Sequence, residues 1–568
     1  MARLTLAEQT RLAKLLVDRS CRAASARLKQ SPLLKWRYGP PVADRLLLVP
    51  VELRAADPSF AGEIDFGHYG LDGALAVLED DQSPFEIAAP TVAWARELHG
   101  FSWLRHLHAA GNAGARDSAI ALVTDWCRRN PQPATGIAWE PVVVARRLMS
   151  WLANAPLILD GVEPAVYDIM ADALADHLIH LSATWPDAPQ GEPRLVALAA
   201  VLMGNLCVAG HDRNLAAAAQ AFSAELDLQI LPDGGHVSRN PAVLVTLLLD
   251  FLPLRQCFVT RDRPLPAGFD GAVRRMLRML QYLRLGTGRI AQFNGVSAQA
   301  IDALSTVLAY DDKALDPITS APQSKYVRLE RGGVVVLVDA GPPPPLEVSG
   351  QAHAGCLSFE MSAKAQALFV NCGAPSPAAL EWLPAARATS SHNTVAIGGK
   401  SSAKLLQDDR FASLLGGTPL RFPECVGSKV TPRDGGIELD AFHDGYFVRF
   451  KLLHRRRIIL DAEGASIVGI DRLGPQRGQL RLPIDVPFAI HFHVDEKVDC
   501  TVGDVPHSAN LKLLDGQRWR FRCEGAALSI EEGMNFSNVG GPRPSLQLVL
   551  RAATFGESDV KWTVERML

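Results

Sequence analysis

Up to about Leu308, apolar residues recur along the chain at the spacing of amphipathic helices. They stand at i, i+3, i+4 and i+7, and Pro or Gly separates one such segment from the next at short intervals. The segments with this pattern are 115–129, 141–155, 164–184, 194–209 and 215–230. Many amphipathic helices joined by short loops, with no sharp repeat, predict an (α/α) toroid or an irregular α-solenoid.

The pattern changes after the segment 311–320. Short β-branched or alternating runs follow, separated by Asp-Gly, Gly-Gly and Asn-Phe-Ser turns. These runs are 333–339, 356–362, 367–371, 446–453, 457–460, 490–494, 519–523 and 546–550. Closely spaced strands without intervening helices predict an antiparallel β-sandwich. The expected fold class is a multidomain α-then-β chain, with an N-terminal (α/α) toroid at 1–320 and a C-terminal antiparallel β-sandwich at 321–568.

Composition adds limits to this picture. The chain has 568 residues, 48% of them hydrophobic and 21% charged, which is enough for two or three domains with their own cores. A net charge of −3 gives no overall attraction to nucleic acid, so we expect no nucleic-acid partner. The nine cysteines are scattered singly without a Cys-x-x-Cys pair, which argues against a disulfide framework or a zinc ribbon.

The N-terminal segment does not resemble a secretory leader. Arg3, Glu8, Arg11 and Lys14 interrupt any apolar run of the length that a signal peptide needs. No stretch approaches the ~18–20 apolar residues of a membrane span. We therefore expect a cytoplasmic protein without a membrane span, or a periplasmic one if the start codon is misassigned. A homodimer stays open.

A first polar cluster follows the turn Asp233-Gly-Gly235. His236, Arg239 and Asn240 precede a helix expected to begin near Pro241. A helix N-terminus attracts anions, Arg recognises carboxylates in a bidentate manner, and His supplies a base near neutral pH. The structural alternative is a turn followed by an N-cap at Asn240, with His236 at the surface.

A second polar cluster opens the strand-rich half. His353 begins a strand, and His392 with Asn393 precedes another, 39 residues later. A hairpin or a sheet crossing would bring the two histidines together, although such residues more often serve the fold. His392 and Asn371 are the candidate metal ligands. Because an amide is a poor zinc ligand, no cofactor is required, and a structural divalent metal stays open.

Other polar residues are candidates for binding sugar. Trp139, with Glu140 and Arg146, lies at the start of a helix, where it would line a sugar groove or serve packing and capping. Asn294 lies in the turn Phe293-Asn-Gly295. The full set of substrate-binding candidates is Trp139, Glu140, Arg146, Asn294, Arg387 and Asn393.

In chain order, the Asp-Gly-Gly turn, Ala352-His-Ala, Leu-Ser-Phe-Glu and Ser391-His-Asn-Thr-Val395 resemble the heparinase II/III-like polysaccharide lyases. The resemblance covers most of the chain, from about Trp103-Leu-Arg105 to Asp471-Arg-Leu473. It implies a toroid and a β-sandwich with a cleft between them, in which uronic-acid polymers are cleaved by β-elimination. It also implies that His353 is the catalytic-domain histidine. His392 matches a histidine that helps to hold a structural metal in some members.

The chain departs from the family pattern at four places. Gly355 stands where the family has the Asp of Gly-His-Ala-Asp, and Asn371 replaces the Asp of Asp-Pro-Gly. Val243 occupies the place of the usual tyrosine base. The Asn-His pair of the helical half has no clear match, and Glu192 lies near its expected place. These changes remove a carboxylate metal ligand and the tyrosine base.

The leading hypothesis is a lyase acting on an acidic polysaccharide or oligosaccharide. His236 would replace the tyrosine as base or acid, Arg239 and Asn240 would bind the carboxylate, and His353 would act from across the cleft. The modest basic content favours an unsulfated uronate. One alternative is a non-catalytic carbohydrate-binding or envelope-polysaccharide protein on a lyase scaffold. Another is a glycoside hydrolase, for which Asp233 and Glu140 are the testable carboxylate pair.

Overall fold

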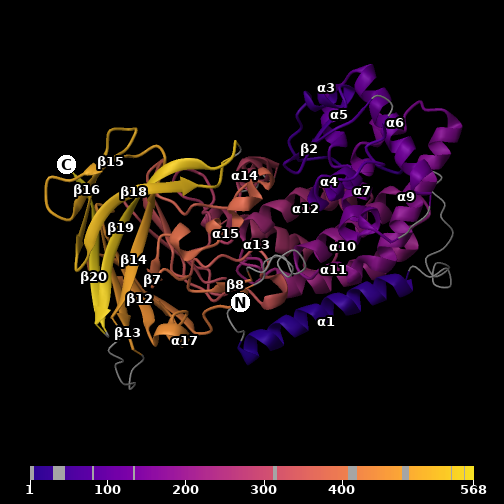
Figure 1. The fold of residues 1–568 in the computed structure, drawn as a ribbon. Coiled ribbons are helices and arrows are strands. Elements are labelled where there is room, and N and C mark those ends of the chain that lie inside the picture. The colour runs from indigo at the N-terminus through magenta and orange to yellow at the C-terminus, as the bar shows by residue number, and fades with distance from the viewer. Residues whose placement is uncertain are drawn as a thin grey trace.

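The computed structural model describes residues 5–29, 45–79, 82–131, 135–310, 316–406, 419–475, 485–538, 540–555 and 557–567. A helical part and a strand-rich part lie side by side, in indigo to magenta and in orange to yellow (Figure 1). The predicted fold class, a toroid followed by a β-sandwich, is confirmed. The segment 311–315, where the sequence pattern changes, lies outside the described residues.

The helical part follows the predicted segments closely. Its main elements are α1 (Leu6–Lys29), α3 (Phe60–Asp65), α4 (Val92–Gly100), α5 (Leu104–Ala110), α6 (Ala113–Arg129), α7 (Pro141–Ala153), α8 (Ala155–Ile158), α9 (Pro164–Thr184), α10 (Glu192–Cys207), α11 (Leu215–Gln229), α12 (Pro241–Thr260), α13 (Phe269–Tyr282) and α14 (Ala298–Tyr310). Single turns of 3-10 helix join some of them: η2 (Ile137–Trp139), η3 (Trp185–Asp187) and η4 (Asp212–Asn214). Helix α10 contacts α7, α9, α11 and α12, and its residues from Leu195 to Cys207 are all buried. A helix that is apolar on every side belongs inside the protein.

Helix α12 corrects one expectation. Its segment Pro241–Thr260 is long and apolar enough to cross a membrane by composition, so the expectation that no stretch approaches that length is wrong. In the structure 78% of the apolar window is buried inside the protein, against α10, α13 and α14. The helix starts as predicted, with Pro241 in its first turn and the Asn240 side chain accepting a hydrogen bond from the Ala242 amide at 2.9 Å.

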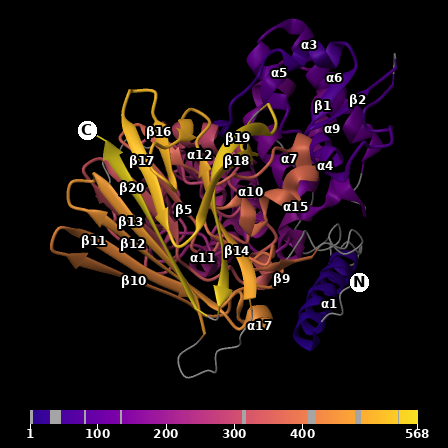
Figure 2. The same cartoon turned by 60° about the vertical axis from the view of Figure 1, so that its left-hand side comes forward.

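The strand-rich part consists mainly of two antiparallel sheets. The first contains, in spatial order, β10 (Val426–Arg433), β11 (Gly436–His443), β12 (Leu453–Asp461), β13 (Ser466–Gly474), β20 (Ser558–Met567), β17 (Arg518–Glu524), β16 (Ser508–Lys512) and β15 (Asp499–Val502). The second contains β18 (Ala527–Asn535), β19 (Arg543–Phe555), β14 (Asp485–Val494), β6 (Gln366–Phe369), β5 (Phe359–Ala363), β4 (Val334–Asp339) and β3 (Tyr326–Arg331), with β7 (Val395–Ile397) beside β14. Figure 2 shows the strands of both sheets fanning out beside the helices. Short elements between the strands are η5 (Leu346–Val348), η6 (Pro377–Trp382), α15 (Leu383–Ala386), η7 (Thr389–Ser391), the pair β8 (Lys404–Leu405) and β9 (Pro419–Arg421), and α17 (Phe447–Phe450).

Strand β4 joins the two hydrophobic cores. All six of its residues are buried. Val334, Val336 and Val338 pack in the core between the two sheets. Val335 and Leu337 point the other way and belong to the core of the helical part. Because successive side chains of a strand alternate between its faces, this uninterrupted apolar run places the second sheet between the toroid and the first sheet.

Two features differ from the sequence prediction or were not foreseen. The run 446–453, predicted as a strand, contains the helical turn α17 instead, so that prediction is wrong. A hairpin of β1 (His68–Leu71) and β2 (Ala74–Val77) interrupts the helical part. Its turn at Gly73 (φ 75°) lies against η6 of the sandwich, where an added Cβ would be 2.2 Å from the Ala378 nitrogen. The predicted boundary at 320/321 falls between the end of α14 and the start of β3.

Helix α1 also links the two parts. It lies along the helical part with its N-terminal end near the sandwich (Figure 1). Its side chains form ion pairs with the strand-rich half: Glu8 with Lys404 at 2.8 Å and Arg11 with Glu424 at 2.9 Å. The toroid and the sandwich are therefore connected by α1, by the hairpin turn and by the shared packing of β4.

Candidate active site

A buried polar network joins the toroid to the sandwich around Arg239. Its guanidinium contacts Asp339 at the end of β4 at 2.5 Å and donates to the carbonyl oxygens of Ser324 (3.0 Å) and Pro342 (2.8 Å). The guanidinium also lies 4.9 Å from the centre of the Tyr326 ring. Arg239 has a left-handed backbone (φ 56°), which these contacts hold in place. Its charge is therefore already paired inside the protein.

Two asparagine side chains extend this network towards His353. Asn294 donates to the second carboxylate oxygen of Asp339 at 3.1 Å and accepts the His353 backbone N–H at 3.3 Å. Asn240, which caps α12, donates to Gln351 at 2.7 Å. The polar cluster that precedes α12 and the loop that carries His353 therefore meet where the toroid touches the sandwich.

His353 and His392 form a direct pair. Nδ1 of His353 lies 3.1 Å from Nε2 of His392, and the rings are nearly perpendicular. Nδ1 of His392 lies 2.8 Å from the Ala388 carbonyl oxygen, which only accepts hydrogen bonds, so this nitrogen carries the proton. In the neutral rings His353 Nδ1 then donates to His392. The hydrogen-bonding pattern leaves a lone pair on His353 Nε2, which has no hydrogen-bond partner within the described part of the chain.

Burial keeps this pair neutral. It lowers the pKa of His392 to about 4. Burial, together with the nearby His392 and Arg387, lowers the pKa of His353 well below its ordinary value. Arg387 donates from Nε and Nη2 to the Ala352 carbonyl, at 2.9 and 2.7 Å, and so holds the residue before His353. At neutral pH, His353 Nε2 is therefore an unprotonated acceptor with a fixed tautomer.

His236 has a different environment. Its Nδ1 accepts the Ser238 backbone N–H at 3.0 Å, and its Nε2 lies 3.1 Å from the Gln229 side-chain oxygen. Burial lowers its pKa to about 3. Both ring nitrogens are engaged, and the ring is 2% exposed. This is the environment of a histidine that fixes a turn.

The candidates at the start of α7 lie in three different settings. Trp139 is buried between the rings of Trp126 and His180, so it offers no open face for a sugar. Glu140 pairs with Arg96 at 2.7 Å. Arg146 binds both carboxylate oxygens of Asp250 in α12, at 3.0 and 2.7 Å.

Asp233 and Glu140, the carboxylate pair considered for hydrolysis, are each held by separate contacts. Asp233 accepts the backbone N–H groups of Gly235, Gln323 and Ser324, at 3.1, 2.9 and 2.7 Å. It thereby fixes its own turn to the segment before β3, while Glu140 belongs to the Arg96 ion pair. These contacts give neither carboxylate the setting of a general acid or base.

The candidate metal ligands do not fit a metal site. His392 uses both ring nitrogens in the contacts above. Asn371 accepts the Asn393 backbone N–H at 3.0 Å through its side-chain oxygen, and Asn393 in turn donates to the Phe359 carbonyl at 2.8 Å. Among the described residues, no group of three or more His, Cys, Asp or Glu side chains has the arrangement of a metal site.

A cavity of about 550 Å³ opens on the toroid side of this network. Asn240, Gly295 and Gln351 form the wall next to the His353 loop. The other walls come from the segment 53–55, from α12 and from α14, with Arg105 and Glu192 among the lining residues. This volume is in the range of small-molecule sites, about 300–1,000 Å³. Burial raises the pKa of Glu192, which favours the neutral carboxyl.

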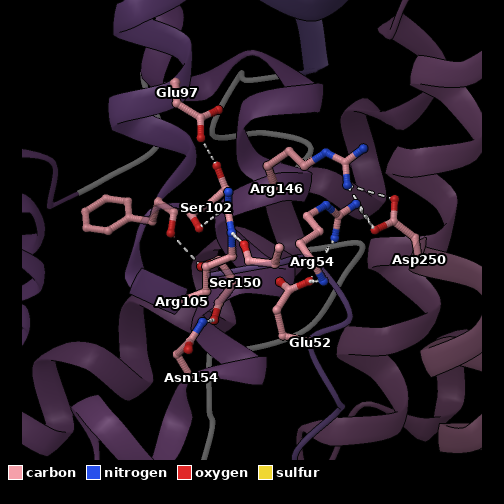
Figure 3. A network of polar contacts seen from close by, with 11 residues as sticks. Glu52, Arg54, Glu97, Ser102, Arg105, Arg146, Ser150, Asn154 and Asp250 are labelled. Atoms are coloured by element: carbon pink, nitrogen blue, oxygen red, sulfur yellow. Dashed lines mark hydrogen bonds and ion pairs between the residues drawn. The ribbon is translucent and has the colours of Figure 1, made fainter. Parts of the chain in front are cut away.

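A charged network supports one end of the cavity (Figure 3). Arg54 and Arg146 both point to the Asp250 carboxylate, with Arg54 at 2.6 Å, and Glu52 lies on the other side of Arg54 at 3.2 Å. Arg105 is held by the carbonyl oxygens of Ala55 (2.9 Å) and Ser102. Among the described residues, the arginines that line the cavity are Arg54 and Arg105, while Arg146 pairs with Asp250 and is not part of the lining.

The sequence candidates did not include Arg54, Arg105 or Glu192. Arg105 lies in the segment where the family resemblance begins, and Glu192 lies near the place of the family's Asn-His pair. Those positions were the available signal, but neither carries a recognisable motif. Arg54 lies in an irregular segment, and its role depends on Asp250, which is 196 residues away in the chain.

Comparison with known proteins places the fold in context. Residues 313–563 match the family model described as heparinase II/III-like, C-terminal. FtsZ-localized protein C of Caulobacter vibrioides is 29% identical over 537 residues, which cover 91% of this chain and 89% of that protein. A mutant of heparan sulfate lyase HepC from Pedobacter heparinus has a TM-score of 0.62 at 15% identity, covering 98% of this chain and 88% of that one. Heparinase III has a TM-score of 0.65 at 14% identity, covering 86% and 80%.

These findings confirm the resemblance that the sequence motifs indicated. At such low identity the two lyase structures establish the fold alone. The match over residues 313–563 covers the loop of His353 and the strand that follows His392. The chain therefore carries a heparinase II/III-like C-terminal domain and has the toroid-and-sandwich fold of the heparinase II/III-like polysaccharide lyases.

Proposed function

We propose that the protein is a lyase that cleaves a uronic-acid-containing polysaccharide or oligosaccharide by β-elimination, with His353 Nε2 as the proton acceptor. The observation that carries this proposal is the lone pair on His353 Nε2, which has no hydrogen-bond partner among the described residues. Its tautomer is fixed by the relay through His392 to the Ala388 carbonyl. A base needs a proton-free nitrogen in a defined orientation, and this relay supplies one.

The chemistry places two demands on the site. The C5 proton of a uronate is weakly acidic, so hydrogen-bond donors must stabilise the negative charge that develops on the carboxylate in the transition state. A base then takes the C5 proton, and the electrons of the C5–H bond form the C4–C5 double bond. The C4–O4 bond breaks with its electron pair on O4, and a general acid protonates this leaving oxygen. The arginines of the neighbouring cavity are the donors for the first demand. A bound uronate also brings a negative charge that raises the pKa of His353 towards a useful range.

In this proposal, the residues before α12 position the base. Arg239 and Asn240 hold Asp339 and Gln351, which flank the His353 loop in sequence and space. His236 fixes the turn before them. The earlier assignment of His236 as the replacement for the family's tyrosine is not part of this proposal, because both of its ring nitrogens are engaged.

A panel of unsulfated and sulfated uronate polymers tests this function. We expect an ultraviolet-absorbing unsaturated product from at least one of them, and a roughly thousandfold loss of rate in His353→Gln, the scale of a lost general base. His68→Gln changes an exposed histidine of the β1–β2 hairpin and should leave the rate unchanged. Full activity in His353→Gln, or no unsaturated product from any polymer, would contradict the proposal.

A second candidate function comes from the relative in Caulobacter vibrioides. That protein is described as FtsZ-localized, and its similarity extends over 91% of this chain. The alternative is a non-catalytic protein that keeps the lyase scaffold and associates with FtsZ assemblies. Co-sedimentation of the full chain with purified FtsZ filaments tests it: association without any unsaturated product favours this alternative. The cellular location stays a prediction.

A further inference from the structure

The two arginines that line the toroid cavity differ in their partners among the described residues. Arg54 is paired with Asp250 and Glu52. Arg105, by contrast, donates to the backbone carbonyl oxygens of Ala55 and Ser102. Within the described part of the chain, no carboxylate lies within ion-pair distance of Arg105. Its positive charge is therefore oriented by the protein but not neutralised by a contacting acid.

This situation favours binding of an anion. Burial lowers the pKa of Arg105, although Glu97 and Glu52, which lie beyond ion-pair distance, act to raise it, so its charged form is partly desolvated. A half-buried charge without a contacting counter-ion carries a desolvation cost, and a ligand carboxylate would remove part of that cost. A guanidinium has five N–H donors in a planar fork, and the contacts with Ala55 and Ser102 leave some of them for a ligand.

The surroundings of Arg105 give this binding a direction. On its other side lies a second cavity, of about 340 Å³, whose walls carry Asp57, Glu63, Asp72 and Glu97. Those carboxylates repel an anion. The first cavity has fewer acids, Glu192 and Asp302, and burial favours the neutral form of Glu192 by raising its pKa. It also offers Arg54 beside Arg105, together with Asn240 and Thr246. An anionic ligand is therefore accommodated on the side that faces the His353 loop.

We propose that Arg105, with Arg54 beside it, binds the carboxylate of a uronic-acid residue in the toroid cavity and so selects acidic over neutral sugars. This inference rests on the proposed function for the identity of the sugar, but it concerns binding and requires no bond cleavage. The cavity of about 550 Å³ has room for a sugar ring beside the carboxylate.

Calorimetric titration of the full chain tests the inference with three probes: a glucuronate-containing oligosaccharide, its carboxyl-reduced counterpart, and a sulfated neutral oligosaccharide. We expect the acidic oligosaccharide to bind at least about tenfold more tightly than the carboxyl-reduced one, because reduction removes the charge-assisted hydrogen bonds to the guanidinium. Arg105→Gln should abolish this preference. The control Arg96→Gln removes an exposed arginine of the toroid that pairs with Glu140, and it should keep the preference.

The design remains decisive if Arg105→Gln does not fold. Ala303→Asp then adds a carboxylate to the α14 wall of the cavity, and it should weaken binding of the acidic probe alone. Equal affinity of the wild type for the acidic and reduced probes, an unchanged preference in the folded variant, or tight binding of the sulfated probe in place of the uronate would each overturn the inference.

The same titration separates this inference from the lyase proposal. His353→Gln should bind the acidic probe as the wild type does. If no polymer yields an unsaturated product but the preference still depends on Arg105, the lyase proposal fails and the carboxylate subsite stands. If product forms but Arg105→Gln keeps the preference for acidic ligands, the lyase proposal stands and the carboxylate subsite fails.

Discussion

At the scale of single residues, Gly355 explains how the histidine pair forms. A Cβ added at this position would lie 2.6 Å from Cδ2 of His392, far closer than two carbon atoms can approach. The family resemblance places an aspartate there, and the present orientation of His392 excludes that side chain. The replacement that looks like a lost aspartate in the sequence is therefore the change that gives the His392 ring room to meet His353.

Gly355→Ala is expected to displace the His392 ring and break its contact with His353. We expect a loss of about 1–3 kcal/mol in the free energy of unfolding, the usual cost of overpacking a filled site. The rate of the proposed elimination should fall with it, because the tautomer of His353 is no longer fixed. Denaturant unfolding and the ultraviolet assay measure the two effects.

A matched glycine provides the control. Gly540 has no atom within 4 Å of an added Cβ, so Gly540→Ala should change the free energy of unfolding by less than about 0.5 kcal/mol. An unaltered unfolding free energy and an unaltered rate in Gly355→Ala would show that the histidine pair does not depend on this space.

At the scale of elements, the ion pair of Arg239 and Asp339 fastens the start of α12 to the end of β4. Both side chains are buried, 7% and 5% exposed. We expect Arg239→Met to lower the free energy of unfolding by about 3–5 kcal/mol, because it leaves the Asp339 carboxylate buried without its partner. Denaturant unfolding followed by tryptophan fluorescence measures this loss.

Removing the Asp339 charge as well separates the effect of the lost ion pair from the effect of the lost Arg239 packing. The double variant Arg239→Met with Asp339→Leu should recover part of the loss, since no uncompensated charge remains. The exposed pair Arg472–Asp559 is the control, and Arg472→Ala should cost less than about 1 kcal/mol. A loss in Arg239→Met no larger than in Arg472→Ala would contradict the role given to this pair.

The elements also show where the local sequence pattern is sufficient to predict secondary structure and where it is not. The predicted segment 164–184 coincides with α9, because one face of an amphipathic helix can be recognised without knowing its partner. The run 446–453 has the alternation of a strand but forms the turn α17, which connects β11 to β12. There the pairing of neighbouring strands, absent from the local sequence, decides the conformation.

At the scale of the whole molecule, buried histidines make stability depend on pH. Burial lowers the pKa of His236 to about 3, that of His392 to about 4 and that of His493 to about 3. In the unfolded chain these groups have pKa values near 6.5, so below that pH the unfolded state binds more protons. Their stabilising contribution is complete above pH 6.5 and is lost progressively as the pH falls towards 3–4.

We therefore expect the free energy of unfolding to fall between pH 7 and pH 5, by up to about 2 kcal/mol for each such histidine, since one pKa unit corresponds to about 1.4 kcal/mol. Glu360 acts in the opposite direction, because burial raises its pKa to about 7, and burial raises the pKa of Glu192 as well. The lowered histidines outnumber these carboxyls, since burial also lowers the pKa of His99 and His106 to about 4. Denaturant unfolding at a series of pH values measures the slope. A constant or rising stability on acidification would contradict this expectation.

The sequence by itself determined the architecture and the places where chemistry gathers. Apolar periodicity depends on local geometry, so the helices, most strands and the order toroid-then-sandwich could be read from it. The motifs around His236, His353 and His392 indicated where the two halves meet. Only the tertiary structure decided which groups are available: Arg239 is paired with Asp339, His236 is engaged on both nitrogens, and Arg105 contacts backbone carbonyls but no carboxylate among the described residues. Whether a side chain is free to bind or react depends on its burial and on partners that can lie a hundred or more residues away in the chain. Neither is a property of the local sequence.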